Sequence, residues 1–457
     1  MLHIRKKFSA VLSARLLFVA SAIFLLFSYG VFVGRYHLFP SQFVTHAEKG
    51  FCNLLTKIMP TLAWYYRRVG DQHPVPYLNT GKAHEGLNLV TKVASDRQLI
   101  VEIVDMNGQK LHEWQIDWFK IWPDAEHLPG SVVPKDKPGT HILDALVMEE
   151  GDLVFNFEFL GLVRLDRKGK VVWRLPYQTH HSVHRHDDGN LWVCGMKVHT
   201  EPDSRFPNRK PPFTEYTLLE VTPYGKIAEE WSVADLLNEN GLAGLLYLGT
   251  PTNNPMVLGG DWLHLNDVEP FPATMEEDFF SQGDILVSLR NINTVFVFNR
   301  HNRKIKFICT GWFVRQHDPD FLDGNRFSVF DNNDIAPEKH GQQSRIVIVS
   351  AREKTLEVFF EGNVNIPFYT DIMGKHQWLP NGNLLITESR KGRAFEINRH
   401  GEVAWEYVNY VDRGVVGVVE EVQRLPLVYK SLFVHSESEG SYGHRPNLQG
   451  GGSVPMT

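Results

Sequence analysis

Five histidines occur along the chain at matching places, each opening a short segment that leads toward a turn of Gly with Asn or Asp. The segments are His141-Ile-Leu-Asp144, His181-Ser-Val-His184, His264-Leu-Asn-Asp267, His317-Asp-Pro-Asp320 and His376-Gln-Trp-Leu379. Imidazole serves as nucleophile, acid, base or metal ligand near neutral pH. A single histidine in a strand is usually structural, but five at one place in a repeat predict a shared site. We expect all five to face one channel, with His141 and His376 lining it without reacting.

The elements that would position these histidines are short strands separated by turns. From Gly86 to Val408 the pattern is alternating or β-branched, with no long helical periodicity, which predicts an all-β body. A unit of about four strands recurs, with one copy that lacks its leading strand. Four tryptophans fall near the ends of units and are predicted to be core residues: Trp114, Trp173, Trp231 and Trp405.

The repeat predicts a six-bladed β-propeller over residues 86–434, because radial repetition places the leading strands around a central channel. The first unit, Leu87 to Ile116, lacks its leading strand. We expect the missing strand to come from the C-terminal side, within Val422 to Val434. A sandwich is the competing architecture, but it does not predict a repeating four-strand register.

The N-terminus predicts a transmembrane helix. Residues 16–34 carry no charge and are long enough to cross a bilayer, and four basic residues precede them: Arg5, Lys6, Lys7 and Arg15. This asymmetry places residues 1–15 in the cytoplasm and the body outside it, in the periplasm if the cell is Gram-negative. A cleaved signal peptide is the alternative. Residues 35–85 are expected to form a stalk, helix-like around 51–69, and residues 435–457 a disordered tail.

Composition excludes some partners and cofactors. The formal net charge of −6 gives no basic surface for phosphates, so we expect no nucleic-acid partner. The three cysteines, Cys52, Cys194 and Cys309, are too scattered for a disulfide framework or a thiolate metal site. We therefore expect Cys194 and Cys309 to be small buried hydrophobes.

Several segments together resemble the arylsulfotransferase family, over roughly residues 86 to 410. They are HLNDVEP from His264, GDILVSLRNINTVFVF from Gly283, QHDPDF from Gln316 followed by an FDNN strand, and NGNLLITESRKGRAFEINRHGEVAWEYV from Asn381. Members of that family are six-bladed propellers. Those with demonstrated activity use a histidine nucleophile and need no nucleotide sulfate donor, so the resemblance implies no cofactor.

The resemblance also implies roles for individual residues. The nucleophile falls on His317, substrate binding on His264 and Asn266, and sulfate binding on Arg290. The early channel histidine falls on His181, with His180 and His184 close by. This sequence departs from the family in an acidic and aromatic insertion, Pro270 to Gln282, which we expect to reshape the channel mouth.

The residue types support sulfuryl transfer from an aryl sulfate to a phenol without the resemblance. A neutral imidazole can attack sulfur directly, and the planar fork of Arg290 suits sulfuryl oxygens. A second histidine, His264 or His181, can exchange a proton with the phenol. A sulfohistidine intermediate would divide the reaction into two displacements.

Two other functions remain open on sequence alone. One is a metalloenzyme whose channel histidines hold iron, although Arg290 would repel a cation there. The other is a non-catalytic extracytoplasmic propeller that binds a ligand or protein. In a non-catalytic protein these residues would be structural: Arg290 would form an ion pair, and Asn266 would cap a turn. The sequence leaves the natural donor and acceptor and the oligomeric state open.

Overall fold

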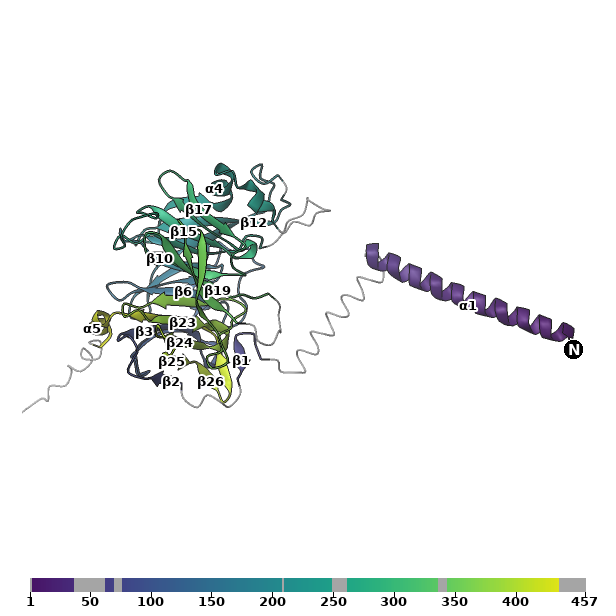
Figure 1. The fold of residues 1–457 in the computed structure, drawn as a ribbon, viewed down its shortest axis with the longest axis horizontal. Coiled ribbons are helices and arrows are strands. Elements are labelled where there is room, and N and C mark those ends of the chain that lie inside the picture. Colours follow the sequence, from purple (N-terminus) through teal and green to yellow (C-terminus); the bar gives the residue numbers. More distant parts are fainter. Residues whose placement is uncertain are drawn as a thin grey trace, which may run out of the picture. The chain divides into compact units, whose positions relative to one another are not determined.

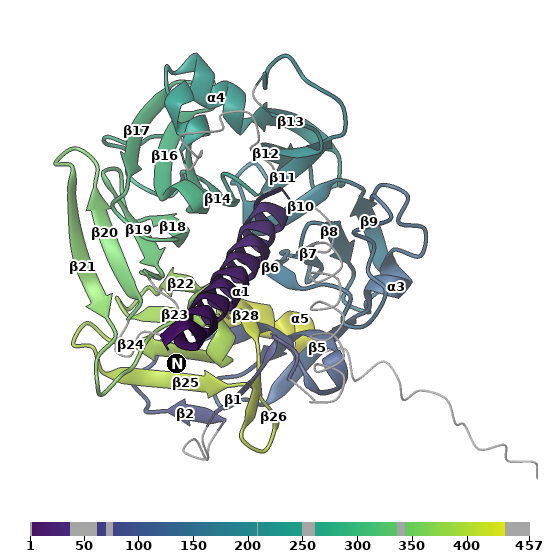
Figure 2. The same cartoon turned by 90° about the vertical axis from the view of Figure 1, so that its right-hand side faces the viewer.

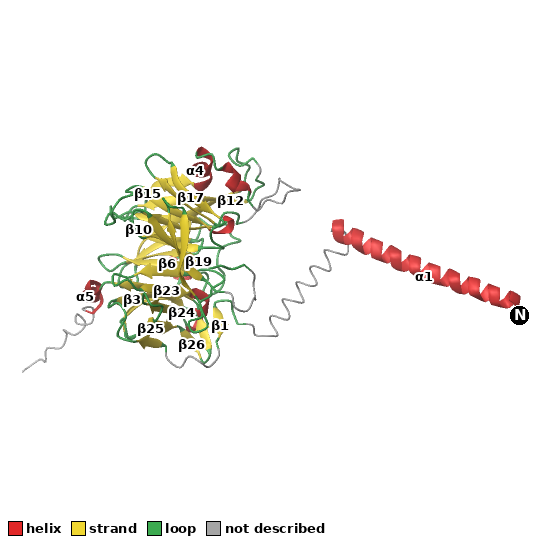
Figure 3. Ribbon diagram, viewed as in Figure 1, coloured by secondary structure: helices red, strands yellow, loops and turns green. Residues whose placement is uncertain are grey.

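The computed structural model describes residues 2–36, 62–69, 76–207, 209–248, 261–335 and 343–434, and strands dominate the larger part (Figures 1 and 3). The chain divides into two compact units, Met1–Ala63 and Trp64–Thr457. The expected disordered tail, 435–457, lies outside the described residues. So do 37–61 and 70–75 of the expected stalk.

The first unit is described by its helix, α1 (Leu2–Tyr36). Its segment Leu16–Val33 has a mean hydropathy of 2.4 and is long enough to span a membrane. Most side chains of this segment are exposed, Phe18 at 75%. A helix that is apolar on all sides needs a lipid or protein environment. A signal sequence near an N-terminus meets the same criterion.

Within the described residues of the second unit, six antiparallel sheets each contain four strands in sequential order. The first sheet holds β28 (Val419–Leu425), β3 (Leu87–Val93), β4 (Leu99–Val104) and β5 (Lys110–Ile116). The second holds β6 (Ile142–Val147), β7 (Leu153–Phe157), β8 (Gly161–Leu165) and β9 (Val171–Leu175). The third holds β10 (Gln178–Arg185), β11 (Leu191–His199), β12 (Phe213–Val221) and β13 (Ile227–Ser232).

The other three sheets follow the same order. The fourth holds β14 (Leu265–Pro270), β15 (Asp284–Leu289), β16 (Thr294–Asn299) and β17 (Ile305–Thr310). The fifth holds β18 (His317–Phe321), β19 (Arg326–Asp331), β20 (Arg345–Ser350) and β21 (Thr355–Glu361). The sixth holds β22 (Lys375–Trp378), β23 (Leu384–Glu388), β24 (Arg393–Ile397) and β25 (Val403–Val408), and gains a fifth strand, β2 (Tyr77–Asn79).

The sheets are arranged around a centre, with the leading strand of each sheet innermost (Figure 2). Each leading strand contacts the next in cyclic order, from β28 to β6, β10, β14, β18 and β22, and from β22 back to β28. The all-β, propeller-like arrangement therefore agrees with the sequence. The missing leading strand of the first sheet comes from the C-terminal side as expected, with Val422 paired to Val90, although β28 begins three residues earlier than the predicted range.

Hydrophobic cores lie between neighbouring sheets, which explains the strand sequences. Central strands such as β15 are buried on both faces and are therefore almost continuously apolar, whereas outer strands such as β21 keep exposed positions. One core cluster joins the sixth sheet to the first through Trp405, Tyr407, Val90 and Val422.

The predicted core tryptophans lie on outer strands and mark the seams between sheets. The indole nitrogens of Trp114, Trp173 and Trp405 donate hydrogen bonds to backbone carbonyls of the following sheet, at 3.0, 2.9 and 3.0 Å. The acceptor of Trp405 is Met106, in the first sheet. Trp231 instead stacks on Trp192 at 4.9 Å. Trp114, Trp231 and Trp405 are buried as predicted, while Trp173 is half-buried.

Part of the expected stalk belongs to the second unit, which begins at Trp64. A small sheet joins β1 (Tyr66–Arg68) to β27 (Val415–Gly417) and β26 (Tyr410–Asp412), and β2 pairs with β25. The remaining described elements are short helical segments between strands, η1 (Ser95–Arg97), α3 (Trp118–Ile121), α4 (Val233–Glu239), η2 (Ala243–Tyr247), η3 (Arg290–Ile292) and η4 (Ser389–Lys391), and two after the last strand, η5 (Leu427–Tyr429) and α5 (Lys430–Val434).

The insertion Pro270 to Gln282 packs differently from the expectation. It joins the end of β14 to the start of β15, whereas His264 and Arg290 flank the opposite ends of those strands. Phe271 and Phe280 are fully buried within the core of the fourth and fifth sheets. The insertion therefore fills a seam away from the mouth that it was expected to reshape. Cys194 and Cys309 are buried free thiols as predicted, and Cys52 lies outside the described residues.

Candidate active site

Five of the six leading strands carry a β-bulge, in most of them at the start of the strand, and the bulges bring side chains to the centre. Register shifts interrupt β6, β10, β14, β18 and β28. A bulge inserts an unpaired residue and re-aims its side chain. The backbones of His181, His264 and Asp318 have positive φ of 53°, 53° and 50°, an uncommon conformation for such residues that often marks function.

A small central cavity of about 30 Å³ lies between these bulges. His181, Asn266 and His317 line it together with Asp318 and Glu420. Three of the predicted site residues therefore share one enclosed space. Its volume matches about two water molecules, so it suits a group of a few atoms and is too small for an aromatic ring.

Arg290 and His264 join the three residues of the central cavity. The Arg290 Nη1 lies 2.9 Å from Nε2 of His264, and the rings of His264 and His181 are 4.9 Å apart, edge to face. The positive charge of Arg290 also lowers the pKa of His317. The structure thus brings together all five residues that the sequence predicted for the site: His181, His264, Asn266, Arg290 and His317.

One ring nitrogen of His317 is hydrogen-bonded, and the other has no hydrogen-bond partner among the described residues. Its Nδ1 lies 2.6 Å from Oδ1 of Asn332. The Asn332 amide nitrogen donates to the carbonyls of Thr370 and Met373 at 3.0 and 2.8 Å, so its oxygen must face His317 as an acceptor. His317 therefore carries its proton on Nδ1. Nε2 keeps a lone pair and has no hydrogen-bond partner among the described residues.

Burial and the charge of Arg290 hold the pKa of His317 well below its usual value, against the opposing hydrogen bond with Asn332. The imidazole is therefore neutral at physiological pH. A neutral imidazole with a directed, unpartnered lone pair is the form that can act as a nucleophile.

His264 is part of an acid–imidazole pair that the sequence analysis missed. Its Nδ1 hydrogen-bonds the carboxylate of Asp261, which also accepts a hydrogen bond from the Tyr216 hydroxyl. Its Nε2 then accepts from Arg290. Burial lowers the pKa of His264, and Arg290 adds to this effect against the opposing Asp261. Asp261 stands three residues before His264, and this spacing was the available signal.

Two arginines lie near each other at this site, and only one was predicted. Arg290 opens η3 after β15, and its buried Nε has no partner among the described residues. Burial and the charge of Arg315 lower the pKa of Arg290. Arg315 has a weak ion pair with Asp334 at 4.0 Å. Two neighbouring cations with spare donors favour binding of an anion. Arg315, two residues before His317, could have been found from that position.

The two histidines near His181 in the sequence, His180 and His184, have different surroundings. Nδ1 of His180 lies 2.8 Å from Nδ1 of His181, and burial lowers the pKa of His180 to about 3. His184 points away and lies 3.1 Å from Asp267, which raises its pKa to about 9 against the effect of burial. Of the three candidates, His181 is the one that lines the central cavity.

Asn266 binds the adjacent sheet rather than capping a turn. Its Nδ2 donates to the carbonyl of Gln316 at 2.8 Å, next to His317. Its Oδ1 is buried and has no partner among the described residues. A buried, unsatisfied acceptor in a functional cavity is a ready contact for a ligand hydroxyl.

His141 and His376 do not line the central cavity. Nδ1 of His141 contacts Glu420 at 2.7 Å, and the His141 ring stacks beside Trp64 at 4.4 Å. The side chain of His376 is fully buried between Asp318 and the Ser328 hydroxyl, at 2.9 and 2.7 Å. Glu420 of β28 and Asp318 of β18, the partners of these two histidines, come from neighbouring leading strands, so equal spacing in sequence does not give an equal environment.

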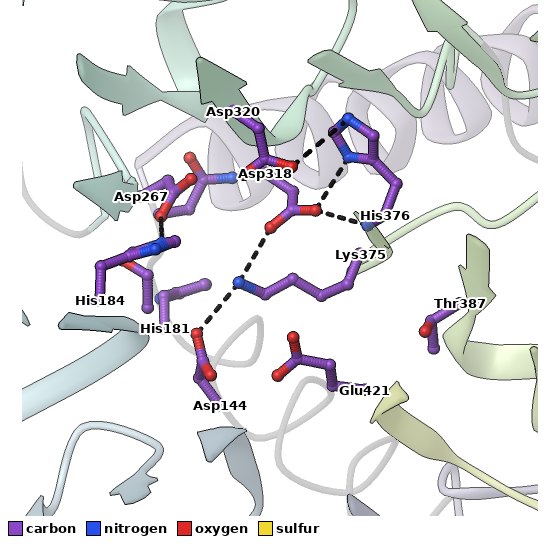
Figure 4. A network of polar contacts seen from close by, with 12 residues as sticks. Asp144, His181, His184, Asp267, Asp318, Asp320, Lys375, His376, Thr387 and Glu421 are labelled. Carbon is purple, nitrogen blue, oxygen red and sulfur yellow. Dashed lines mark hydrogen bonds and ion pairs between the residues drawn. The ribbon is translucent and has the colours of Figure 1, made fainter. Parts of the chain in front are cut away.

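A buried network of acids around Lys375 lies beside the central cavity (Figure 4). The Lys375 ammonium contacts Asp144 at 3.1 Å and Asp318 at 3.0 Å. Burial raises the pKa of Asp318, but Lys375 acts against this effect and holds the pKa below its usual value. Burial lowers the pKa of Lys375, but Asp144 and Asp318 act against this effect and raise it. Asp318 also orients His376, because it accepts hydrogen bonds from the ring and from the backbone amide of that residue.

Among the described residues, one group of three has potential metal-ligand atoms within 4.8 Å of one another: Asp318, Asp320 and His376. The Lys375 ammonium already neutralises Asp318 there, and both ring nitrogens of His376 have partners. This group lacks His181, His264 and His317, so it differs from the predicted alternative of a channel-histidine iron site.

The chain belongs to the arylsulfotransferase family, because the profile of the family described as Arylsulfotransferase (ASST) matches residues 144–410. This confirms the resemblance drawn from the sequence, and the family supports a sulfotransferase enzyme in general. No curated protein matches the chain.

Solved structures show only distant likeness. One is a protein of unknown function from Bacteroides caccae, with 14% identity, a TM-score of 0.46, and coverage of 74% of this chain and 98% of that one. A second is TolB from Acinetobacter baumannii, with 10% identity, a TM-score of 0.41, and coverage of 76% and 69%. A third is virginiamycin B lyase from Staphylococcus aureus, with 10% identity, a TM-score of 0.36, and coverage of 74% and 89%.

Proposed function

We propose that this protein is a six-bladed β-propeller that transfers a sulfuryl group from an aryl sulfate to a phenolic acceptor through a sulfohistidine on His317, without a nucleotide donor. The observation that carries the proposal is the state of His317. This side chain is neutral, its Nδ1 is committed to Asn332, and its Nε2 is open beside Arg290. Membership of the arylsulfotransferase family supports the reaction class.

In the first displacement, Nε2 of His317 attacks the sulfur of the aryl sulfate. An N–S bond forms, the S–O bond to the ring breaks, and the phenolate leaves with the bonding pair. Sulfuryl transfer resembles phosphoryl transfer, in which catalysis consists mainly of positioning and charge stabilisation. Arg290 and Arg315 supply the positive charge for the sulfuryl oxygens, and Asn332 supports the imidazolium that develops.

In the second displacement, the acceptor hydroxyl attacks the sulfur and His317 leaves as a neutral imidazole. His264 takes the acceptor proton on Nε2, and the Asp261 carboxylate stabilises the resulting cation. Protonation of Nε2 ends its hydrogen bond from Arg290. The proton gained in this step neutralises the leaving phenolate of the next turnover. His181 and Asn266 position the group that occupies the central cavity.

We also propose that α1 is retained as a membrane anchor, with the propeller outside the cytoplasm. The length and hydropathy of Leu16–Val33 and the basic residues before it support this placement. An extracytoplasmic enzyme would have no supply of cytoplasmic nucleotide donors. Independence from such a donor is therefore consistent with this location.

The function is tested by incubating the purified chain with a panel of aryl sulfates and phenols, with no nucleotide present. We expect acceptor-dependent transfer with parallel double-reciprocal plots, because the donor product leaves before the acceptor binds. Intersecting plots, or no transfer from any donor, would contradict the proposal. Stoichiometric iron in active protein would instead favour the metalloenzyme.

A further inference from the structure

A larger cavity, of about 530 Å³, adjoins the histidine site. Phe159 lines it and also contacts the site, with its ring 4.9 Å from that of His180 and 5.9 Å from that of His181. On another wall His141 hydrogen-bonds Glu420, which itself lines the small cavity that contains His317. The large cavity is of a size that binds small molecules.

Aromatic side chains form much of the wall of the large cavity. Trp64 and Tyr65 come from the segment just before β1, and Phe159 comes from the turn between β7 and β8. Trp64 is 47% exposed although it stacks on His141 at 4.4 Å. Exposed aromatic faces in a concave site favour stacking with a ligand ring. The small cavity cannot hold a ring, so the ring of a substrate needs this neighbouring space.

The wall of the large cavity carries two carboxylates, Glu158 and Asp136, and the imidazole of His141. Burial lowers the pKa of His141, but Glu420 and Glu158 act against this effect and raise it. Among the described residues, the carboxylates of Glu158 and Asp136 have no hydrogen-bond or ion-pair partner. The only lysine on its wall, Lys137, is 3.2 Å from Asp117 and is thereby neutralised. Burial raises the pKa of Glu158, and the Glu420 carboxylate adds to this effect against the opposing His141. A carboxylate in this situation is stabilised by a cation.

We propose that the large cavity binds the aromatic ring of the sulfuryl acceptor and that Glu158 selects phenols bearing an ammonium group. This inference rests on the proposed function, because the hydroxyl must reach sulfur held at His317. The ring stacks against Trp64 and Phe159, and the ammonium contacts the Glu158 carboxylate. Aromatic faces beside a carboxylate are a favourable environment for an organic cation. Neutral phenols gain only the stacking, and anionic phenols are repelled.

Three acceptors with the same ring and similar length test the charge selection: tyramine, 4-ethylphenol and 3-(4-hydroxyphenyl)propionate. We expect kcat/KM to fall in that order, with tyramine favoured over 4-ethylphenol by roughly tenfold, as for one hydrogen bond to a charged group. Glu158→Gln should abolish the advantage of tyramine over 4-ethylphenol. Glu357→Gln, at an exposed position of β21, is the matched control. Trp64→Ala should weaken all three acceptors.

Calorimetric binding of tyramine and 4-ethylphenol to the resting protein separates this inference from the proposed function. Binding of tyramine that is stronger than that of 4-ethylphenol and depends on Glu158 supports the cavity assignment, even if no sulfuryl group is ever transferred. Transfer activity with equal preference for tyramine and 4-ethylphenol before and after Glu158→Gln overturns the assignment and leaves the proposed function standing. Unchanged binding in both Glu158→Gln and Trp64→Ala also overturns it.

Discussion

At the scale of single residues, the account depends on how hydrogen bonds fix the proton on each imidazole. Asn332 accepts from Nδ1 of His317, whereas Asp261 accepts from Nδ1 of His264. A neutral amide leaves an imidazole uncharged, but a carboxylate stabilises the imidazolium. The two histidines therefore differ in role. His317 is suited to attack sulfur, and His264 is suited to accept a proton.

Asn332→Asp tests this difference directly. A carboxylate beside Nδ1 should raise the pKa of His317 by about 1 to 3 units. A protonated ring has no lone pair on Nε2 and cannot attack sulfur. The burst of phenol released in the first turnover should therefore begin to decline at a higher pH in the variant than in the unaltered protein. In the unaltered protein the amplitude of the phenol burst should not change as the pH falls just below about 6.5, the ordinary pKa of histidine, because the pKa of His317 is lowered. If the phenol burst declines at the same pH in a folded Asn332→Asp variant, Asn332 does not control the nucleophile.

Arg290→Lys keeps one positive charge but removes the planar fork of donors. We expect turnover to fall by about 100-fold or more, as when one transition-state donor is lost. Thermal unfolding should change little, because the side chain of Arg290 hydrogen-bonds His264 and has no ion pair with an acid among the described residues. Initial rates and unfolding curves of the two proteins make the comparison. Near-normal turnover would assign Arg290 a structural role.

The sequence predicted the five central residues because each belongs to a recognisable segment, but it did not predict their partners. Asn332 is contributed by the end of β19, and its link to His317 depends on strand pairing. Asp261 and Arg315 lie three and two residues before predicted histidines, and that proximity in sequence was the only signal for them. Contacts between different sheets follow from packing, which the linear pattern does not contain.

At the scale of elements, the leading strands must hold polar side chains in a buried centre. The bulges turn His181, Asn266 and Asp318 toward one cavity, and Lys375 neutralises acids contributed by two other strands. A buried ion pair contributes little net stability, but loss of one partner is strongly destabilising. The Lys375 network should therefore be essential to the fold of the channel.

Lys375→Met should lower the free energy of unfolding by about 3–5 kcal/mol, because it leaves Asp144 and Asp318 buried without a cation. Lys110→Met, which removes an exposed pair with Glu113, should cost no more than about 1 kcal/mol. Asp318 has a folded pKa below its unfolded value, so its stabilisation is present above the unfolded pKa and is lost as pH falls through the folded one. The deficit of Lys375→Met should accordingly shrink at acid pH. Denaturant curves at several pH values measure both effects, and equal losses for the two lysines would contradict the account.

Strand order could be predicted from the sequence because central strands are apolar runs bounded by Gly turns. The places of β1 and β2 could not, since each has only three residues and is defined by its pairing with β27 or β25. The histidine repeat did not show that His141 and His376 are held by acids of other strands, Glu420 and Asp318. Contacts between strands are not contained in the one-dimensional pattern.

At the scale of the whole molecule, the first sheet is completed by a strand from the C-terminal part of the body. β28 supplies the innermost strand of the first sheet, and Trp405 bonds the sixth sheet to Met106 in the first. The N- and C-terminal parts of the body thus fold together, as the incomplete first repeat indicated. The segment Leu16–Val33 is recognisable from sequence as long and apolar enough to span a membrane, because this property needs only length and composition.

A reporter fused after Thr457 tests the proposed topology. Basic residues before the apolar segment favour a cytoplasmic N-terminus, so the reporter should behave as extracytoplasmic. Paired alkaline phosphatase and fluorescent protein fusions give opposite signals in the two locations. Reversal of the charge asymmetry by substituting the four basic residues with Asn or Gln should reduce the export signal. Cytoplasmic activity of the original fusion would refute the orientation.

The central claim, that His317 carries the sulfuryl group, is tested most directly by trapping the intermediate. The protein is incubated with an aryl sulfate and no acceptor, digested at alkaline pH, where an acid-labile sulfated imidazole survives, and analysed by mass spectrometry. We predict one sulfuryl group per chain, on the peptide containing His317. His317→Ala should abolish both the adduct and phenol release, whereas a His264 variant should form the adduct slowly. A sulfated enzyme that still accumulates in His317→Ala would contradict the account and make His264 the nucleophile.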